Sequence, residues 1–145
     1  MARRFRRTLA RRLIDAGATA VIKRGIGPRQ RYLLTVAGRK TGAGYTTPVS
    51  VVVDGNDRYL VAAYGEVGWV RNARAAGAVT LARGDRIERS SVVELRGHDA
   101  APILKRYLAL EPITRSYFNV AANAPLEALE REVATHPVFR LTPIA

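Results

Sequence analysis

The chain has 145 residues, of which 48% are hydrophobic and 25% are charged, as expected of one globular domain with its own core. It contains no cysteine and two histidines, which excludes disulfides, cysteine-bound zinc, iron–sulfur clusters and thiol nucleophiles, so we predict no metal site. The net charge is +12, and residues 1–31 carry ten Lys or Arg residues against one acid, Asp15. Such a segment attracts polyanions, whether nucleic acid, anionic lipid or a multiply charged ligand.

Residues 2–24 are predicted to form a basic amphipathic helix. Apolar residues recur at spacings of three and four and so share one face: Phe5, Leu9, Leu13, Ala16 and Ala20. Two roles remain open, because this helix could pack on its own domain or could lie on an anionic membrane surface through residues 1–31. Nucleic acid is not favoured. The segment lacks a clear secretory leader, so we expect a cytoplasmic protein, with peripheral contact to the inner face of the membrane as an option.

The rest of the chain alternates between β-rich runs and glycine-containing turns. We predict strands at 32–37, 46–53, 58–64, 79–83, 87–95 and 138–141, and helices at 67–76, 98–110 and 126–134. Because strand–helix–strand units do not recur, a Rossmann sheet is disfavoured and a small antiparallel barrel is favoured.

The turn Gly38-Arg39-Lys40-Thr41-Gly42 is a candidate anion site. It gathers two cations, a hydroxyl and glycine-freed backbone N–H groups between two strands, although it matches neither a Walker motif nor a dinucleotide fingerprint. A solvated hairpin turn is the alternative interpretation.

A second cluster lies on the helix at 67–76. Trp69 and Asn72 are three residues apart and adjacent, as are Arg71 and Arg74, while core packing is the alternative for Trp69, the one tryptophan. His98 and His136 are interpreted as cap, solvent or turn residues, and the acids of the last helix as solvated: Glu127, Glu130 and Glu132. With so few catalytic side chains, an enzyme of this kind would rely on a bound cofactor.

The order of these motifs resembles the deazaflavin-dependent nitroreductase family of actinobacteria, a branch of the split β-barrel flavin and deazaflavin oxidoreductases. The resemblance covers about residues 31–142 and rests on the Gly38–Gly42 turn, Thr46-Thr47-Pro48-Val49, Tyr59–Ala63 and Gly68–Ala75. It implies an FMN-binding-like split β-barrel at 31–145, which together with the basic helix at 1–30 gives an α+β fold of two parts.

The resemblance also implies coenzyme F-420, an 8-hydroxy-5-deazaflavin with a phosphate and an oligoglutamate tail. The phosphate would be held by Arg39, Lys40, Thr41 and Gly42. The deazaflavin would contact Pro48, Val49, Ala62, Ala63, Trp69 and Asn72, and its tail would be served by Arg71, Arg74 and Arg31. FMN is the alternative cofactor, because the family's Ser-Lys-Gly step is replaced here by Ala63-Tyr64-Gly65-Glu66.

The implied chemistry is hydride transfer between the deazaflavin and an organic acceptor such as a quinone, an enone or a nitro compound. Tyr64 and Tyr117, with Tyr45 as a third candidate, would donate hydrogen bonds to that acceptor. The alternatives are a non-catalytic binder of a deazaflavin, FMN or haem-like ligand, or a basic membrane-associated module. The oligomeric state is left open.

Overall fold

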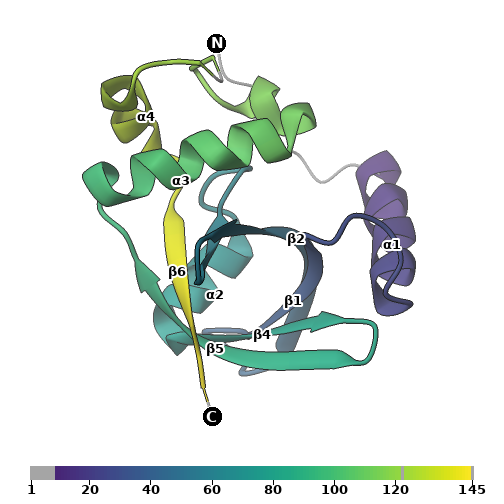
Figure 1. Ribbon diagram of the computed structural model, residues 1–145. Helices are drawn as coiled ribbons and strands as arrows, with labels where there is room; N and C mark the ends of the chain where they lie inside the picture. The colour runs from purple at the N-terminus through teal and green to yellow at the C-terminus, as the bar shows by residue number, and fades with distance from the viewer. Residues whose placement is uncertain (1–8, 122, 145) are drawn as a thin grey trace.

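The computed structural model describes residues 9–121 and 123–144; residues 1–8 of the predicted first helix lie outside them, as do the side chains of residues 9–15. Within these residues, strands form a closed antiparallel barrel in the order β1-β2-β3-β6-β5-β4 (Figure 1). They are β1 (Arg31–Ala37), β2 (Gly44–Asp54), β3 (Asp57–Val61), β4 (Ala78–Arg83), β5 (Arg86–Glu94) and β6 (Val138–Pro143). The predicted α+β barrel is confirmed.

Tight turns join β2 to β3 and β4 to β5, as the sequence predicts. Gly55 and Gly84 stand at these turns with φ of 63° and 55°, a left-handed conformation that favours glycine. The predicted strand at 58–64 is shorter than expected, because β3 ends at Val61 and the chain turns through Gly65, whose φ is 85°.

Alternate residues of the strands fill the barrel. Leu34, Leu60 and Leu81 are fully buried there beside Phe139, and α2 (Gly68–Ala76) adds Val70 and Ala73 to the same cluster. Burying one such large side chain contributes about 1.5–3 kcal/mol. The barrel is therefore a packed core, and a ligand must bind outside it.

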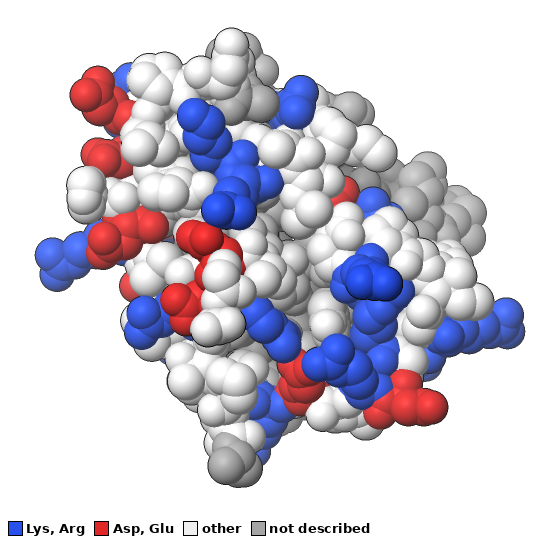
Figure 2. Space-filling model, viewed as in Figure 1, with Lys and Arg blue, Asp and Glu red and all other residues white. Residues whose placement is uncertain are grey.

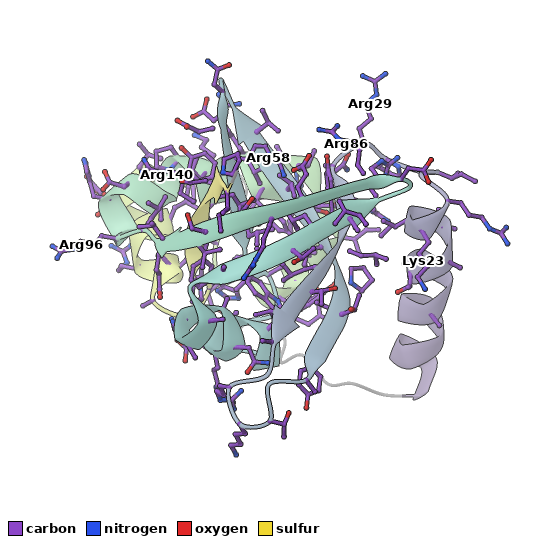
Figure 3. All side chains as sticks on the ribbon, turned by 90° about the horizontal axis from the view of Figure 1, so that it is seen from below. Lys23, Arg29, Arg58, Arg86, Arg96 and Arg140 are labelled. Atoms are coloured by element: carbon purple, nitrogen blue, oxygen red, sulfur yellow. The ribbon has the colours of Figure 1, made fainter. Side chains whose placement is uncertain are left out.

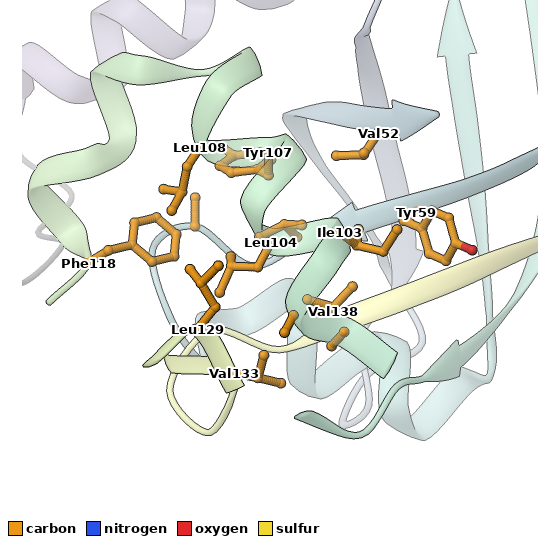
Figure 4. Close-up of a cluster of buried hydrophobic side chains, with 14 residues drawn as sticks. Val52, Tyr59, Ile103, Leu104, Tyr107, Leu108, Phe118, Leu129, Val133 and Val138 are labelled. Carbon is orange, nitrogen blue, oxygen red and sulfur yellow. The ribbon is translucent and has the colours of Figure 1, made fainter. Parts of the chain in front are cut away.

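A second core lies between the barrel and the helices α3 (Gly97–Leu110) and α4 (Leu126–Val133) (Figure 4). Leu104, Leu108 and Leu129 are fully buried in it, as is Val138 of β6. The helix α3 ends before Pro112, as predicted, and the chain continues as the 3₁₀ helix η1 (Pro112–Tyr117). These helices bring a second wall to the outside of the barrel.

The helix α1 (Leu9–Lys23) packs beside β1, β2 and β4, and its Ile22 is buried. Arg83 of β4 holds the loop that follows α1 in place. Its guanidinium donates hydrogen bonds to the carbonyl oxygens of Gly25, Gly27, Pro28 and Arg31 at 2.8–3.2 Å. The helix thus contacts its own domain, one of the two roles left open. In the part of the chain that is described, no helix combines the length and apolarity needed to cross a membrane.

Candidate active site

A cavity of about 710 Å³ lies beside the barrel, within the usual range of small-molecule sites. Its walls come from the β1–β2 turn, the strand β2, the start of α2 and the junction of α3 with η1. Thr46, Pro48 and Ser50, which share one face of β2, all line it. The cavity therefore joins the two motifs singled out in the sequence and adds a third wall.

The β1–β2 turn presents cations at one end of the cavity. Its backbone is closed by hydrogen bonds from Gly38 N to Ala43 O at 2.7 Å and from Gly42 N to Gly38 O at 2.8 Å. Gly42 has a φ of 74°, so this position favours glycine. The side chains of Arg39, Lys40 and Thr41 are exposed and line the cavity.

Asn72 connects the turn to α2. This residue is 6% exposed, and its Oδ1 accepts hydrogen bonds from the Arg39 backbone N at 3.1 Å and from Arg39 Nη1 at 2.8 Å. The two predicted motifs are therefore in direct contact. Asn72 positions Arg39, a role that the sequence analysis did not assign to it.

The turn fits a phosphate group. The amides of Gly38, Arg39 and Gly42 are engaged within the protein, whereas the described residues supply no hydrogen-bond partner to those of Lys40 and Thr41. Two amides, two cations and a hydroxyl are the donor set that binds phosphate oxygens.

Trp69, Pro48 and Val49 line the next part of the cavity, where a flat ring system would need apolar contacts. Trp69 is half-buried, and its ring lies 5.8 Å from that of Phe139, so the indole contacts the core as well as the cavity. The core-packing interpretation is therefore confirmed, while ligand contact stays a prediction that the position of Trp69 on the cavity wall supports.

Tyr64 lines the cavity, and its ring meets that of Tyr117 edge to face at 4.8 Å. Tyr117, at the end of η1, packs against the helical core and lies behind Tyr64 rather than on the cavity wall. The structure thus brings together the two predicted acceptor residues, with Tyr64 on the cavity wall.

Glu111 is the main site feature absent from the sequence analysis. It is 6% exposed and lines the far end of the cavity, where its carboxylate accepts hydrogen bonds from Ser50, Arg31 and Gln30. Tyr107 lies in the same wall, and burial raises the pKa of its phenol well above the ordinary value. The sequence contains only a weak signal for Glu111, which is a carboxylate at the end of a predicted helix just before Pro112.

The remaining predicted residues do not line the cavity. Ala62 and Ala63 are buried in the cores, and Arg71 is exposed elsewhere on α2. Arg74 pairs with Glu94 at 2.7 Å and with Glu66 at 2.9 Å, and these hydrogen bonds, the one to Glu94 above all, raise its pKa. Glu66, which belongs to the segment that stands in place of the family's Ser-Lys-Gly step, is thus paired with Arg74.

One interpretation of the C-terminal region was wrong, and another was incomplete. Glu132 is 6% exposed and accepts a hydrogen bond from the Asn119 backbone N at 2.8 Å, so it is not solvated. His136 lies in the turn after α4, as predicted, but it is 5% exposed there and stacks on Phe118 with 4.1 Å between ring centroids. Both support the segment that carries Tyr117.

The closed antiparallel barrel, with a cation-bearing turn and a cavity on its side, defines a ligand-binding protein of the split β-barrel class. Residues 7–125 match the model of the F420H(2)-dependent quinone reductase family, and the chain belongs to that family. It is therefore an oxidoreductase that depends on coenzyme F-420, which confirms the resemblance drawn from the motifs.

Solved structures share the fold at low sequence identity. An F420-H2 dependent reductase, FDR-A, is 20% identical with a TM-score of 0.56, and the match covers 79% of this chain and 95% of that one. A domain-swapped dimer is 19% identical with a TM-score of 0.58, covering 92% and 93%. A FAD-binding protein from Mesorhizobium loti is 14% identical with a TM-score of 0.52, covering 90% and 89%. Among curated proteins none matches this chain.

Proposed function

We propose that the cavity binds coenzyme F-420 with its phosphate at the β1–β2 turn, and that the protein reduces a small quinone there. The observation that carries this proposal is the contact of Arg39 with Asn72, which joins the phosphate-type turn to the helix bearing Trp69. When bound, the reduced coenzyme supplies a hydride. The protein itself contributes binding, orientation and the exclusion of water.

Each wall of the cavity has its own role in this proposal. Arg39, Lys40 and Thr41 bind the phosphate, while Trp69 and Pro48 flank the ring system and exclude water from it. The phenol of Tyr64 donates a hydrogen bond to the acceptor oxygen, where negative charge develops as the hydride arrives. Tyr117 supports Tyr64 from behind by its edge-to-face contact.

A titration tests the proposal, because Trp69 is the single tryptophan and lies on the cavity wall. Coenzyme F-420 and FMN are added separately to the purified chain while tryptophan fluorescence is followed. We expect selective quenching by the deazaflavin. Turnover is then measured with the reduced coenzyme and a neutral naphthoquinone, with an enone and a nitro compound as alternative acceptors.

Two results would redirect the assignment. Quenching by FMN alone would contradict the placement of coenzyme F-420 in this cavity. Tight binding of coenzyme F-420 without reduction of any acceptor would favour the non-catalytic carrier, which shares the cavity and differs only in turnover.

Contact with an anionic membrane surface is a separate proposal for the region around α1. Support comes from Val21 and Ile26, which are 42% and 57% exposed next to Lys23 and Arg24. Basic side chains also gather where the β4–β5 hairpin approaches α1, among them Arg29, Arg83 and Arg86 (Figure 2). Co-sedimentation with vesicles of neutral and of anionic lipid tests it, and binding to neither would overturn it.

A further inference from the structure

An ion pair forms the wall of the cavity opposite the cationic turn. Arg31 Nη2 lies 3.2 Å from Glu111 Oε2, and both residues line the cavity. Arg31 begins β1, whereas Arg39 follows its end, so the length of the strand places the backbones of the two residues roughly 20 Å apart. The cavity therefore has two distinct polar ends.

The carboxylate of Glu111 is fixed by donors from different parts of the chain. Its Oε1 accepts from Ser50 Oγ at 2.7 Å and from Gln30 Nε2 at 3.3 Å. Ser50 is directly opposite Arg31 in the β1–β2 ladder, so the side chains of Arg31 and Ser50 share a face of the sheet. Three donors on a nearly buried carboxylate hold its orientation, and that carboxylate in turn holds the guanidinium.

This arrangement leaves Arg31 able to bind a ligand. Its side chain is 39% exposed while that of Glu111 is 9% exposed, so the cation is the more accessible partner. A guanidinium carries five N–H groups, and the bond to Glu111 uses one. A purely structural ion pair would not require Arg31, Ser50 and Glu111 all to face the same cavity.

We propose that Arg31, oriented by Glu111, forms an acceptor subsite that hydrogen-bonds the carbonyl oxygen of a quinone as that oxygen gains negative charge. The inference rests on the proposed function and assigns the acceptor end of the same cavity. Tyr64 and Tyr107 line the same cavity as Arg31 and Glu111, so the subsite shares its cavity with the proposed donor Tyr64.

The reaction balances without further reagents. The quinone accepts a hydride, which is two electrons and one proton, and then a second proton, to give the hydroquinone. Oxidation of the reduced coenzyme releases one hydride and one proton, which are the hydride and the proton that the quinone takes up. Arg31 gives up no proton, because a guanidinium stays protonated; it stabilises the oxyanion until the second proton arrives.

Glu111 also determines which acceptors enter. Its charge cancels that of Arg31, so the ion pair is neutral overall and suits an uncharged quinone. Without the carboxylate, an uncompensated cation would attract anionic acceptors. Without the guanidinium, an unpaired carboxylate would repel them. Varying the charge of the quinone therefore tests the role of the Arg31–Glu111 pair.

The experiment compares Glu111→Gln and Arg31→Gln with the unmodified chain, using a neutral naphthoquinone and the same ring bearing a sulfonate. We expect Arg31→Gln to lower kcat/KM for the neutral quinone by about a hundredfold to a thousandfold, as for loss of one oxyanion donor. We expect the sulfonated-to-neutral ratio of kcat/KM to rise by about fivefold in Glu111→Gln and to fall in Arg31→Gln. Matched controls are Glu127→Gln and Arg96→Gln, which change exposed side chains away from the cavity.

A binding measurement makes the subsite testable without turnover. The affinity of the coenzyme-free chain for the sulfonated naphthoquinone, followed by Trp69 quenching, should rise in Glu111→Gln and fall in Arg31→Gln. The proposed subsite would be wrong if each variant changed kcat/KM equally for the two quinones. It would also be wrong if neither variant altered the affinity for the sulfonated naphthoquinone. If Glu111→Gln fails to fold, the opposite shift in Arg31→Gln still decides. A wild-type chain that binds coenzyme F-420 yet reduces neither quinone would overturn the proposed function instead.

Discussion

Asn72 Oδ1 accepts hydrogen bonds from both the backbone and the side chain of Arg39, at 3.1 Å and 2.8 Å. The two residues are 33 positions apart, and the contact fixes a surface turn against a buried position of α2. The direction of the Arg39 guanidinium is therefore set before any ligand binds, which reduces the entropy that phosphate binding would otherwise cost.

Two substitutions of Asn72 distinguish its role in positioning Arg39 from the effect of charge at the phosphate site. Asn72→Asp retains an oxygen for Arg39 but adds a negative charge beside the phosphate site, so we expect affinity for coenzyme F-420 to fall about tenfold or more. Asn72→Ala leaves the Arg39 amide without its acceptor, so we expect both affinity and thermal stability to fall. Fluorescence titration and thermal unfolding measure the two effects.

Exposed Asn56, at the β2–β3 turn, supplies the matched control as Asn56→Asp. Equal coenzyme affinity in Asn72→Asp and the unmodified chain would contradict the placement of the phosphate beside Arg39.

The sequence predicted both halves of this site but not their contact. The turn and the α2 motif were recognisable because glycines, cations and an i,i+3 pair are local signals. The hydrogen bonds between Arg39 and Asn72 depend on how α2 packs against the barrel, which no local pattern encodes.

The same distinction explains what was missed. Most strand and helix positions followed from apolar runs and turn residues, which act over short distances. Glu111, Glu132 and His136 are polar residues buried by segments far from them in the sequence, and the sequence around each is typical of a solvated surface. Their partners had to be seen in three dimensions.

Loss of the turn's cations should abolish tight coenzyme binding. The double variant Arg39→Ala/Lys40→Ala removes two charge-assisted contacts, each contributing about 1.5–3 kcal/mol, so we expect affinity to fall at least about a hundredfold. Both side chains are exposed, so circular dichroism and thermal stability should change little.

Arg96→Ala/Arg140→Ala is the control for net charge, because these two cations are exposed and lie on the opposite side of the molecule from α1 (Figure 3). If this control weakens coenzyme binding as much as the turn variant does, general electrostatics would replace the specific phosphate site.

The two tyrosines should differ in their effects. Tyr64→Phe removes a hydroxyl at the cavity wall, and we expect kcat/KM for a neutral naphthoquinone to fall about a hundredfold to a thousandfold with coenzyme affinity retained. Tyr117→Phe keeps the ring that meets Tyr64 edge to face, so we expect a smaller loss. Steady-state kinetics decide, and a larger effect in Tyr117→Phe would reverse the proposed roles.

His136 should make the stability of the acceptor wall depend on pH. Burial lowers the pKa of this imidazole, and the carboxylate of Glu132, 3.4 Å away, opposes that effect only in part. The folded chain therefore favours the neutral ring, whereas the unfolded chain binds a proton near the ordinary pKa of about 6.5. Below that pH the unfolded state takes up more protons than the folded state, so stability falls as pH decreases.

Urea unfolding at pH 7.5 and pH 5.5 measures this dependence, and His136→Gln should reduce the difference in unfolding free energy between the two conditions. His98→Gln is the control, because that imidazole is 89% exposed at the start of α3. Since His136 stacks on Phe118, next to Tyr117, the unmodified chain should also lose quinone turnover before coenzyme binding as the pH falls. If His136→Gln and the unmodified chain showed the same pH dependence of the unfolding free energy, other groups would be responsible. Glu132, the neighbouring carboxylate, would then be the next residue to substitute.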